Sequence, residues 1–179
     1  MSAFIHHVVY EFRSGIRDRS HLLMTYLFPL VFFALIGGIM TKLNPFFLKT
    51  MIPAMTVFAL MSSFLLSEPS GLVSQRESGV LRSYRINGVP GWTALAAPLA
   101  ANIGHLALVT MIIALVGRWI FGAALPVDLG RFILVWIAAA AAHAALGALI
   151  AVIASSTRSV VLVSQLVFIP SIMLGSAVA

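Results

Sequence analysis

Five apolar runs, each about the length of a membrane-crossing helix, dominate this 179-residue sequence. A hydrocarbon core of about 30 Å requires about 20 consecutive apolar residues, because each helical residue rises about 1.5 Å. Hydrophobic residues make up 61% of the chain and charged residues only 9%, which excludes a soluble globular domain. The sequence therefore predicts an all-α, polytopic membrane protein whose single transmembrane domain covers residues 1–179. The runs occupy residues 22–40, 51–67, 93–117, 132–154 and 160–179.

The residues before the first run follow an amphipathic pattern. Phe4, Val8, Phe12 and Ile16 recur at every fourth position, whereas histidine and charged residues occupy the opposite face. Such a segment is too polar to cross the bilayer and is typical of a helix lying in the headgroup plane. We therefore expect an interfacial elbow helix over residues 1–20, which serves either as a simple anchor or as an element that transmits motion.

The positions of lysine and arginine predict the orientation of the chain. With the N-terminus in the cytoplasm, seven of the eleven Lys and Arg residues lie on the inner side. Cytoplasmic loops carry an excess of these residues, so this orientation is favoured in a multi-pass protein of the cell membrane. The same arginines meet anionic lipid at the helix ends, which accounts for the net charge of +6 without a nucleic-acid partner.

A charged segment interrupts the chain between the second and third runs. It contains Arg76, Glu77, Arg82 and Arg85. Each such charge costs about 2.5–3.5 kcal/mol at the bilayer centre, so the segment must lie outside the lipid. We expect Pro69-Ser70-Gly71 to end the second span and residues 72–86 to form a short cytoplasmic helix. This helix either packs on its own bundle or docks into a groove of another protein.

The stretch RESGVLRSYRINGVPGW, residues 76–92, resembles the cytoplasmic loop in the membrane subunits of type-2 ABC transporters. The apolar-to-turn patterns FGAALP after the third run and IPSIMLG in the fifth are similar to the same family. Two residues depart from the usual pattern, because Arg82 and Tyr84 stand where an acidic residue and leucine are more usual. The matching positions are occupied by Arg76, Glu77, Gly79, Leu81, Gly88 and Pro90.

This resemblance implies six spans, cytoplasmic termini, two membrane subunits, and two ATP-binding subunits that press on the coupling helices. Only five runs are visible before the chain ends in PSIMLGSAVA, so we expect that a sixth helix is missing and that the chain is truncated at its C-terminus. The residues that the resemblance assigns to coupling with the ATPase are Arg76, Glu77, Gly79, Leu81, Arg82, Tyr84 and Arg85.

The acidic residues bear on the energy source. All five lie outside the apolar runs, whereas carriers driven by protons or sodium normally need an ionisable group at membrane depth. The chain also lacks the GxxxxGK[ST] motif of an ATP-binding loop. We therefore expect no cofactor in this chain, with ATP and Mg²⁺ bound by a separate ATP-binding cassette ATPase. No residue is predicted to be catalytic or to bind a metal.

Two histidines lie near the middle of neighbouring apolar runs. His105 and His143 would reach similar depths in antiparallel helices, and could line a polar substrate path with Asn102 and Gln165. The alternative is that each histidine bonds a backbone carbonyl in a tight helix contact. Small residues recur every four positions around His143, which favours this alternative.

These observations predict a membrane-spanning permease subunit of an ATP-driven ABC exporter. Its expected partners are the ATPase, a second permease subunit that is identical or different, and membrane lipids. Two alternatives remain open at this stage: a secondary carrier or channel that uses the histidines, and a membrane scaffold that transports nothing.

Overall fold

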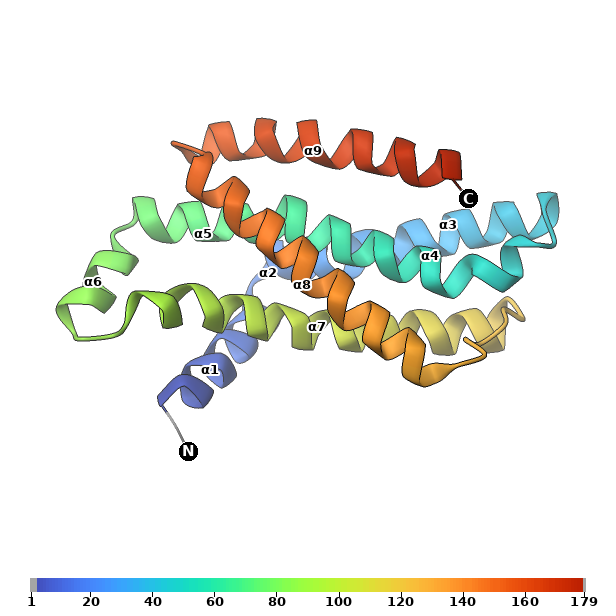
Figure 1. Ribbon diagram of the computed structural model, residues 1–179, viewed down its shortest axis with the longest axis horizontal. Coiled ribbons are helices and arrows are strands. Elements are labelled where there is room, and N and C mark those ends of the chain that lie inside the picture. Colours follow the sequence, from blue (N-terminus) through green and yellow to red (C-terminus); the bar gives the residue numbers. More distant parts are fainter. Residues whose placement is uncertain (1–2, 179) are drawn as a thin grey trace.

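The structure is a computed structural model that describes residues 3–178, with side chains placed for residues 4–173. All regular elements in the described part are helices, which confirms the predicted all-α class. The long helices run side by side, with α8 (Leu129–Ile153) crossing its neighbours obliquely (Figure 1). The short helix α6 (Val80–Ile86) lies at one end of the bundle, together with the turn between α8 and α9 (Thr157–Val178). The loops around residues 44–46 and 121–128 lie at the other end.

In the described part of the chain, four continuous helices are long and apolar enough to cross a membrane. Each matches one expected span, although the fourth helix ends one residue before the expected limit at residue 154. The first comprises α2 (Arg19–Leu22), η1 (Leu23–Leu27) and α3 (Phe28–Leu43). The second comprises α4 (Phe47–Ser62), η2 (Ser63–Ser67) and α5 (Glu68–Glu77). The third and fourth are α7 (Gly91–Ile120) and α8 (Leu129–Ile153).

The fifth expected span corresponds to α9 (Thr157–Val178), which begins three residues earlier than the apolar run. The part of α9 up to Met173 is apolar. Residue 179 lies outside the described residues. The helical, multi-pass architecture expected from the sequence is therefore present.

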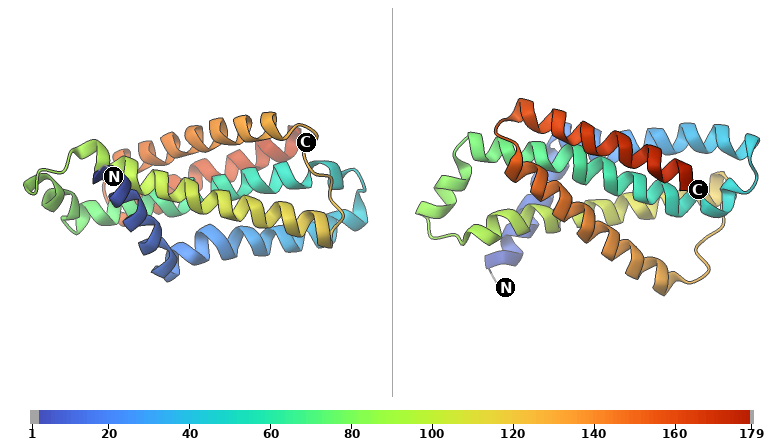
Figure 2. Two further views of the ribbon diagram at one scale, coloured as in Figure 1. Left: turned by 90° about the horizontal axis from the view of Figure 1, so that it is seen from below. Right: turned by 45° about the horizontal axis from the view of Figure 1, so that its top comes forward.

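The amphipathic N-terminal segment forms α1 (Ala3–Arg17), which lies at an angle to the long helices (Figure 2, left). Its apolar face packs against α7: the ring of Phe4 lies 5.3 Å from that of Trp92, measured between centroids. Asp18 then begins the first span, because its Oδ1 accepts hydrogen bonds from the backbone N–H groups of Ser20 and His21. The chain thus turns sharply at Asp18 and enters the bundle.

Each of the first two spans contains one π-helical turn, and each turn ends two residues before a proline. Pro29 and Pro69 cannot donate the usual helical hydrogen bond, and their rings would clash with the carbonyl four residues earlier. A wider π turn is a known way for a helix to accommodate such an interruption. The expectation that Pro69-Ser70-Gly71 ends the second span was therefore wrong, since the helix continues to Glu77.

The core lies where the second span contacts α7 and α8. Gly147 of α8 sits directly on the backbone of η2, because a Cβ added there would overlap the carbonyl oxygen of Phe64. Gly147 and Ala151 are both buried, as the stripe of small residues predicted. The largest fully buried apolar side chains include Phe33, Phe64, Ile52, Leu106 and Ile113.

Candidate functional site

The charged segment between the second and third spans is divided between two helices. Residues 72–77 continue α5, and the chain then breaks before α6 (Val80–Ile86). Gly79 adopts φ +78°, a left-handed conformation that is strained for any residue with a Cβ. The single helix expected over residues 72–86 is therefore two helices joined by a glycine turn.

Arg76 binds the end of the fourth span. Its Nη1 donates to the carbonyl oxygen of Ala151 at 3.1 Å, and its Nη2 donates to that of Ala154. Both acceptors belong to the C-terminus of α8, where carbonyl groups lack helical partners and the helix dipole favours a cation. Arg76 therefore caps α8 from a neighbouring helix.

Glu77 binds the start of the fifth span. One carboxylate oxygen accepts from the backbone N–H of Thr157 at 3.1 Å, and the other accepts from the Thr157 hydroxyl. Thr157 is the first residue of α9, where free N–H groups and the helix dipole favour an anion. Two adjacent side chains thus hold the two sides of the α8–α9 turn, and we call them the Arg76–Glu77 clamp.

The exposed residues of α6 include the remaining cations of the charged segment. Arg82 and Arg85 are exposed, and Ile86 is 75% exposed. The three share one face because they are three or four positions apart on a helix. Ile86 was not among the site residues predicted from the sequence. Its position four residues after Arg82 could have indicated that it shares a helix face with that arginine. This face is available to a partner, whereas the Arg76–Glu77 clamp binds within the chain.

The inner side of α6 faces the bundle. Tyr84 lies edge-on to the ring of His7 in α1, with 5.3 Å between centroids, and Leu81 is half-buried. Burial raises the pKa of Tyr84, with smaller contributions from Glu11 and Tyr10, so its hydroxyl stays protonated at neutral pH. A second cavity of about 450 Å³ lies between α6, α7 and α8, and it is lined by Leu81 and Tyr84 and also by Arg82 and Arg85. The position of α6 therefore depends on α1 as well as on α5.

A larger cavity of about 520 Å³ lies between α1, α5, α7 and α9. Asn102, His105 and Gln165 line it, so the structure brings together three of the four residues expected on a substrate path. His143 does not line this cavity. It is half-buried on α8, and its Nδ1–H donates to the carbonyl oxygen of Ala139 at 2.7 Å, which matches the packing alternative.

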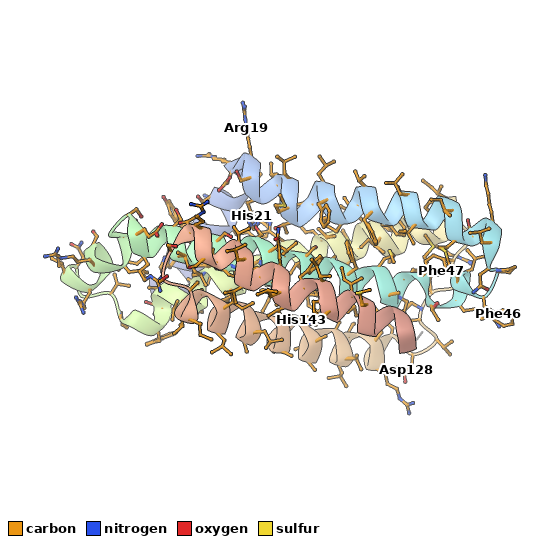
Figure 3. The ribbon with its side chains drawn as sticks, turned by 90° about the horizontal axis from the view of Figure 1, so that it is seen from above. Arg19, His21, Phe46, Phe47, Asp128 and His143 are labelled. Carbon is orange, nitrogen blue, oxygen red and sulfur yellow. The ribbon has the colours of Figure 1, made fainter. Side chains whose placement is uncertain are left out.

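His105 is 1% exposed and contacts the N-terminal part of the chain. Its ring stacks on Phe12 of α1 with 4.1 Å between centroids, and its Nδ1 lies 2.7 Å from the hydroxyl oxygen of Tyr26. The ring of His21 lies 4.9 Å away. Figure 3 shows Arg19 extending away from the bundle while His21 lies against it. His105 thus joins α1 and the first span to α7.

A buried chain of hydrogen bonds connects the two π turns to the cavity. The Thr25 hydroxyl of η1 donates to Ser63 of η2 at 3.1 Å, and the Ser63 hydroxyl donates to Oδ1 of Asn102 at 3.0 Å. Sequence reasoning missed Thr25 and Ser63. The signal that could have found them is their shared position, since each lies within the six residues before a span proline. π turns are frequent at functional sites, and here two of them meet.

Glu68 also lines this cavity and is 8% exposed. The sequence placed it just outside the second span, because the helix was expected to end at the proline that follows. In the structure the helix does not end there, since it continues past Glu68 to Glu77. A buried carboxylate therefore faces the interior of the bundle.

Comparison with known proteins bears on the family of the chain. A family model described as "ABC-2 type transporter" matches residues 3–179. No curated protein and no solved structure gives a significant match. The family match covers almost the whole chain and agrees with its helical, multi-pass architecture. The chain therefore belongs to the ABC-2 type transporter family and is a membrane-embedded permease component of an ABC transporter.

Proposed function

We propose that this chain is the permease subunit of an ATP-driven exporter in the cell membrane. It works with a separate ATP-binding cassette ATPase, which holds ATP and Mg²⁺, and with a second permease subunit. Family membership supports the role of permease. The observation that carries the coupling mechanism is the Arg76–Glu77 clamp, which ties the charged segment to the fourth and fifth spans.

The ATPase contacts the exposed face of α6, formed by Arg82, Arg85 and Ile86. ATP-driven closure of the ATPase subunits displaces α6, and the glycine turn at Gly79 passes this displacement to α5. The Arg76–Glu77 clamp then moves the α8–α9 turn together with α5. In this mechanism one contact surface moves the second, fourth and fifth spans as a unit.

The cavity that contains Asn102 and His105 is the proposed entry to the substrate path. It adjoins α1, which the orientation prediction places on the cytoplasmic side, and an exporter must take up its substrate from that side. Motion of α5 and α9 changes two walls of this cavity directly. The alternative of a secondary carrier or channel uses the intramembrane histidines, and of these His105 lines the cavity whereas His143 bonds a carbonyl of its own helix.

The test is mild-detergent purification of the chain from its native membrane, followed by identification of co-purifying proteins. We expect an ATP-binding cassette ATPase in stoichiometric amount. The double variant Arg82→Glu/Arg85→Glu should lose it, because both charges lie on the proposed contact face. Arg118→Glu, which reverses an exposed charge at the opposite end of the bundle, is the matched control and should retain it. A wild-type preparation without any ATPase would overturn the proposal.

A further inference from the structure

The larger cavity carries charges of one sign. Glu11, Asp18 and Glu68 line it, which are three of the five acidic residues in a chain with a net charge of +6. No lysine or arginine is found among its described lining residues. The electrostatic field inside this cavity therefore attracts cations, in contrast to the charge of the chain as a whole.

Glu68 lies in this cavity without a cationic partner. The ion pairs in the described part of the chain join His7 to Glu11 and Arg131 to Asp128, and neither includes Glu68. Glu11 repels it electrostatically, and the side chain of Asn102 acts on it as a hydrogen-bond donor, but no cation among the described residues lies beside it. Burial of a carboxylate is unfavourable unless a cation or hydrogen-bond donors offset the loss of water. A positively charged ligand would supply this missing partner.

Two further buried groups lack hydrogen-bond partners at normal distance in this cavity. Oγ of Ser164 on α9 makes no hydrogen bond among the described residues, and Nδ2 of Asn102 on α7 makes none of normal length, although it lies near the Glu68 carboxylate. Each of the two side chains is only 1% exposed. Buried polar atoms are nearly always paired in native proteins, so each such atom calls for an explanation. Both atoms can donate to an acceptor atom of a ligand that enters between α7 and α9.

The rest of the cavity defines the size and polarity of this ligand. Its volume of about 520 Å³ falls within the range of small-molecule sites, about 300–1,000 Å³. Apolar side chains, among them Met24, Leu66 and Val161, form other parts of the wall. A bare metal ion is disfavoured, because the described residues contain no group of three or more ligating side chains suited to one.

We propose that this cavity binds an amphiphilic organic ammonium compound that also carries a hydrogen-bond acceptor. The ammonium group pairs with Glu68, and Glu11 strengthens the field around it. Asn102 and Ser164 donate to the acceptor, and the apolar part lies against Met24 and Leu66. This inference names the substrate class of the exporter and rests on the proposed function for the direction of transport, but the binding step requires no ATPase.

The test uses the purified chain in neutral detergent micelles, without ATPase, and the probe is propranolol. This compound combines an aromatic group, an ether, a hydroxyl and a secondary ammonium that is protonated at neutral pH. Equilibrium dialysis, with binding to empty micelles subtracted, should show saturation at one site per chain. N-acetylpropranolol keeps the aromatic group, the ether and the hydroxyl, but its nitrogen is an uncharged amide, and its Kd should be at least about tenfold higher.

Glu68→Gln should raise the Kd for propranolol at least about tenfold, because it removes the charge while preserving the volume. Asp128→Asn is the matched control: it removes a carboxylate at the opposite end of the bundle, and the Kd should stay within about twofold. Glu11→Gln, a change at a more exposed position, should raise the Kd about threefold. This variant replaces Glu68→Gln as the test if Glu68→Gln does not fold.

Equal binding of propranolol and its N-acetyl derivative would overturn the proposal. Unchanged affinity in both the Glu68 and Glu11 variants would also overturn it. The two proposals fail separately, because absence of this binding leaves co-purification of the ATPase unaffected, and loss of the ATPase leaves binding to the isolated chain unaffected.

Discussion

Glu77, the last residue of α5, accepts a hydrogen bond of 3.1 Å from the backbone N–H of Thr157, the first residue of α9. The preceding residue, Arg76, caps the C-terminus of α8. A cation thus lies at a helix C-terminus and an anion at a helix N-terminus, as the helix dipole favours at both positions. The acidic-basic pair of the charged segment therefore joins α5 to the α8–α9 turn, whereas Arg82 and Arg85 of α6 are exposed.

Glu77→Gln should weaken the transmission of motion to α9 without removing the ATPase. The native chain has no cysteine, so a single Gln165→Cys change on the cavity wall can report the movement of α9. In the assembled complex, ATP should change the rate at which a water-soluble maleimide labels this cysteine. Glu77→Gln should reduce that ATP-dependent change about threefold. Asp128→Asn is the control, and an undiminished response in Glu77→Gln would refute the proposed role of the clamp.

Arg76→Gln should destabilise the membrane domain by about 1 kcal/mol, because the carbonyls of Ala151 and Ala154 lose a charged donor. The midpoint of thermal unfolding in detergent should fall by about 2–4 °C for a domain of this size. Arg76→Lys should recover only part of this loss, since an ammonium group cannot reproduce the planar two-donor geometry. An unchanged unfolding midpoint in Arg76→Gln would show that these bonds add nothing to stability.

Gly147→Ala should destabilise the bundle, although alanine is the better helix former. The added Cβ would overlap the Phe64 carbonyl oxygen, and a backbone atom can yield only if α8 or η2 shifts. Overpacking of this kind costs about 1–3 kcal/mol. Gly38→Ala is the matched control, because a Cβ there meets nothing within 4 Å, and it should be neutral or slightly stabilising. Similar unfolding midpoints for the two variants would contradict the tight contact.

Gly79→Ala should impair the turn between α5 and α6. At φ +78° a residue with a Cβ is strained by about 1 kcal/mol or more, so α6 should change its angle to α5. We expect less ATPase to co-purify with this variant. Gly71→Ala, also near the charged segment but within a helix and with open space around it, should bind the ATPase as the wild type does. Equal recovery of ATPase in both variants would argue against a fixed turn.

Asn102→Ala should raise the Kd for propranolol several-fold, whereas His143→Ala should leave it within about twofold. The reason is their placement: Asn102 lines the cavity with an amide nitrogen that makes no hydrogen bond of normal length, and His143 bonds a carbonyl of its own helix. Equilibrium dialysis of the two variants measures the difference. A larger increase in Kd for His143→Ala than for Asn102→Ala would indicate that His143, rather than Asn102, contacts the ligand.

The second span shows where reasoning from the sequence succeeded and where it failed. Its apolar residues predicted a membrane helix, and the charged residues that follow predicted that this helix ends outside the lipid. Pro69 was interpreted as the point where the helix stops, yet the π turn before it lets the helix continue to Glu77. Whether a proline ends or only widens a helix depends on contacts with neighbouring helices, and here α8 packs on that turn.

The two histidines illustrate the same limit. Their depths followed from counting residues along each helix, but their partners depended on how each helix is rotated about its axis. α7 turns His105 toward α1 and the first span, whereas α8 leaves His143 bonded to Ala139. A lone histidine in an apolar run carries no local sign of that rotation.

The sequence by itself determined the class of this protein, its spans, its amphipathic N-terminal helix and the charged segment outside the lipid. These features follow from the transfer free energy of residues that are close together along the chain. Only the tertiary structure decided that Arg76 and Glu77 clamp the α8–α9 turn and that Glu68, Asn102 and Ser164 face one cavity. These relationships join residues far apart in sequence, and they depend on helix packing, rotation and the π turns.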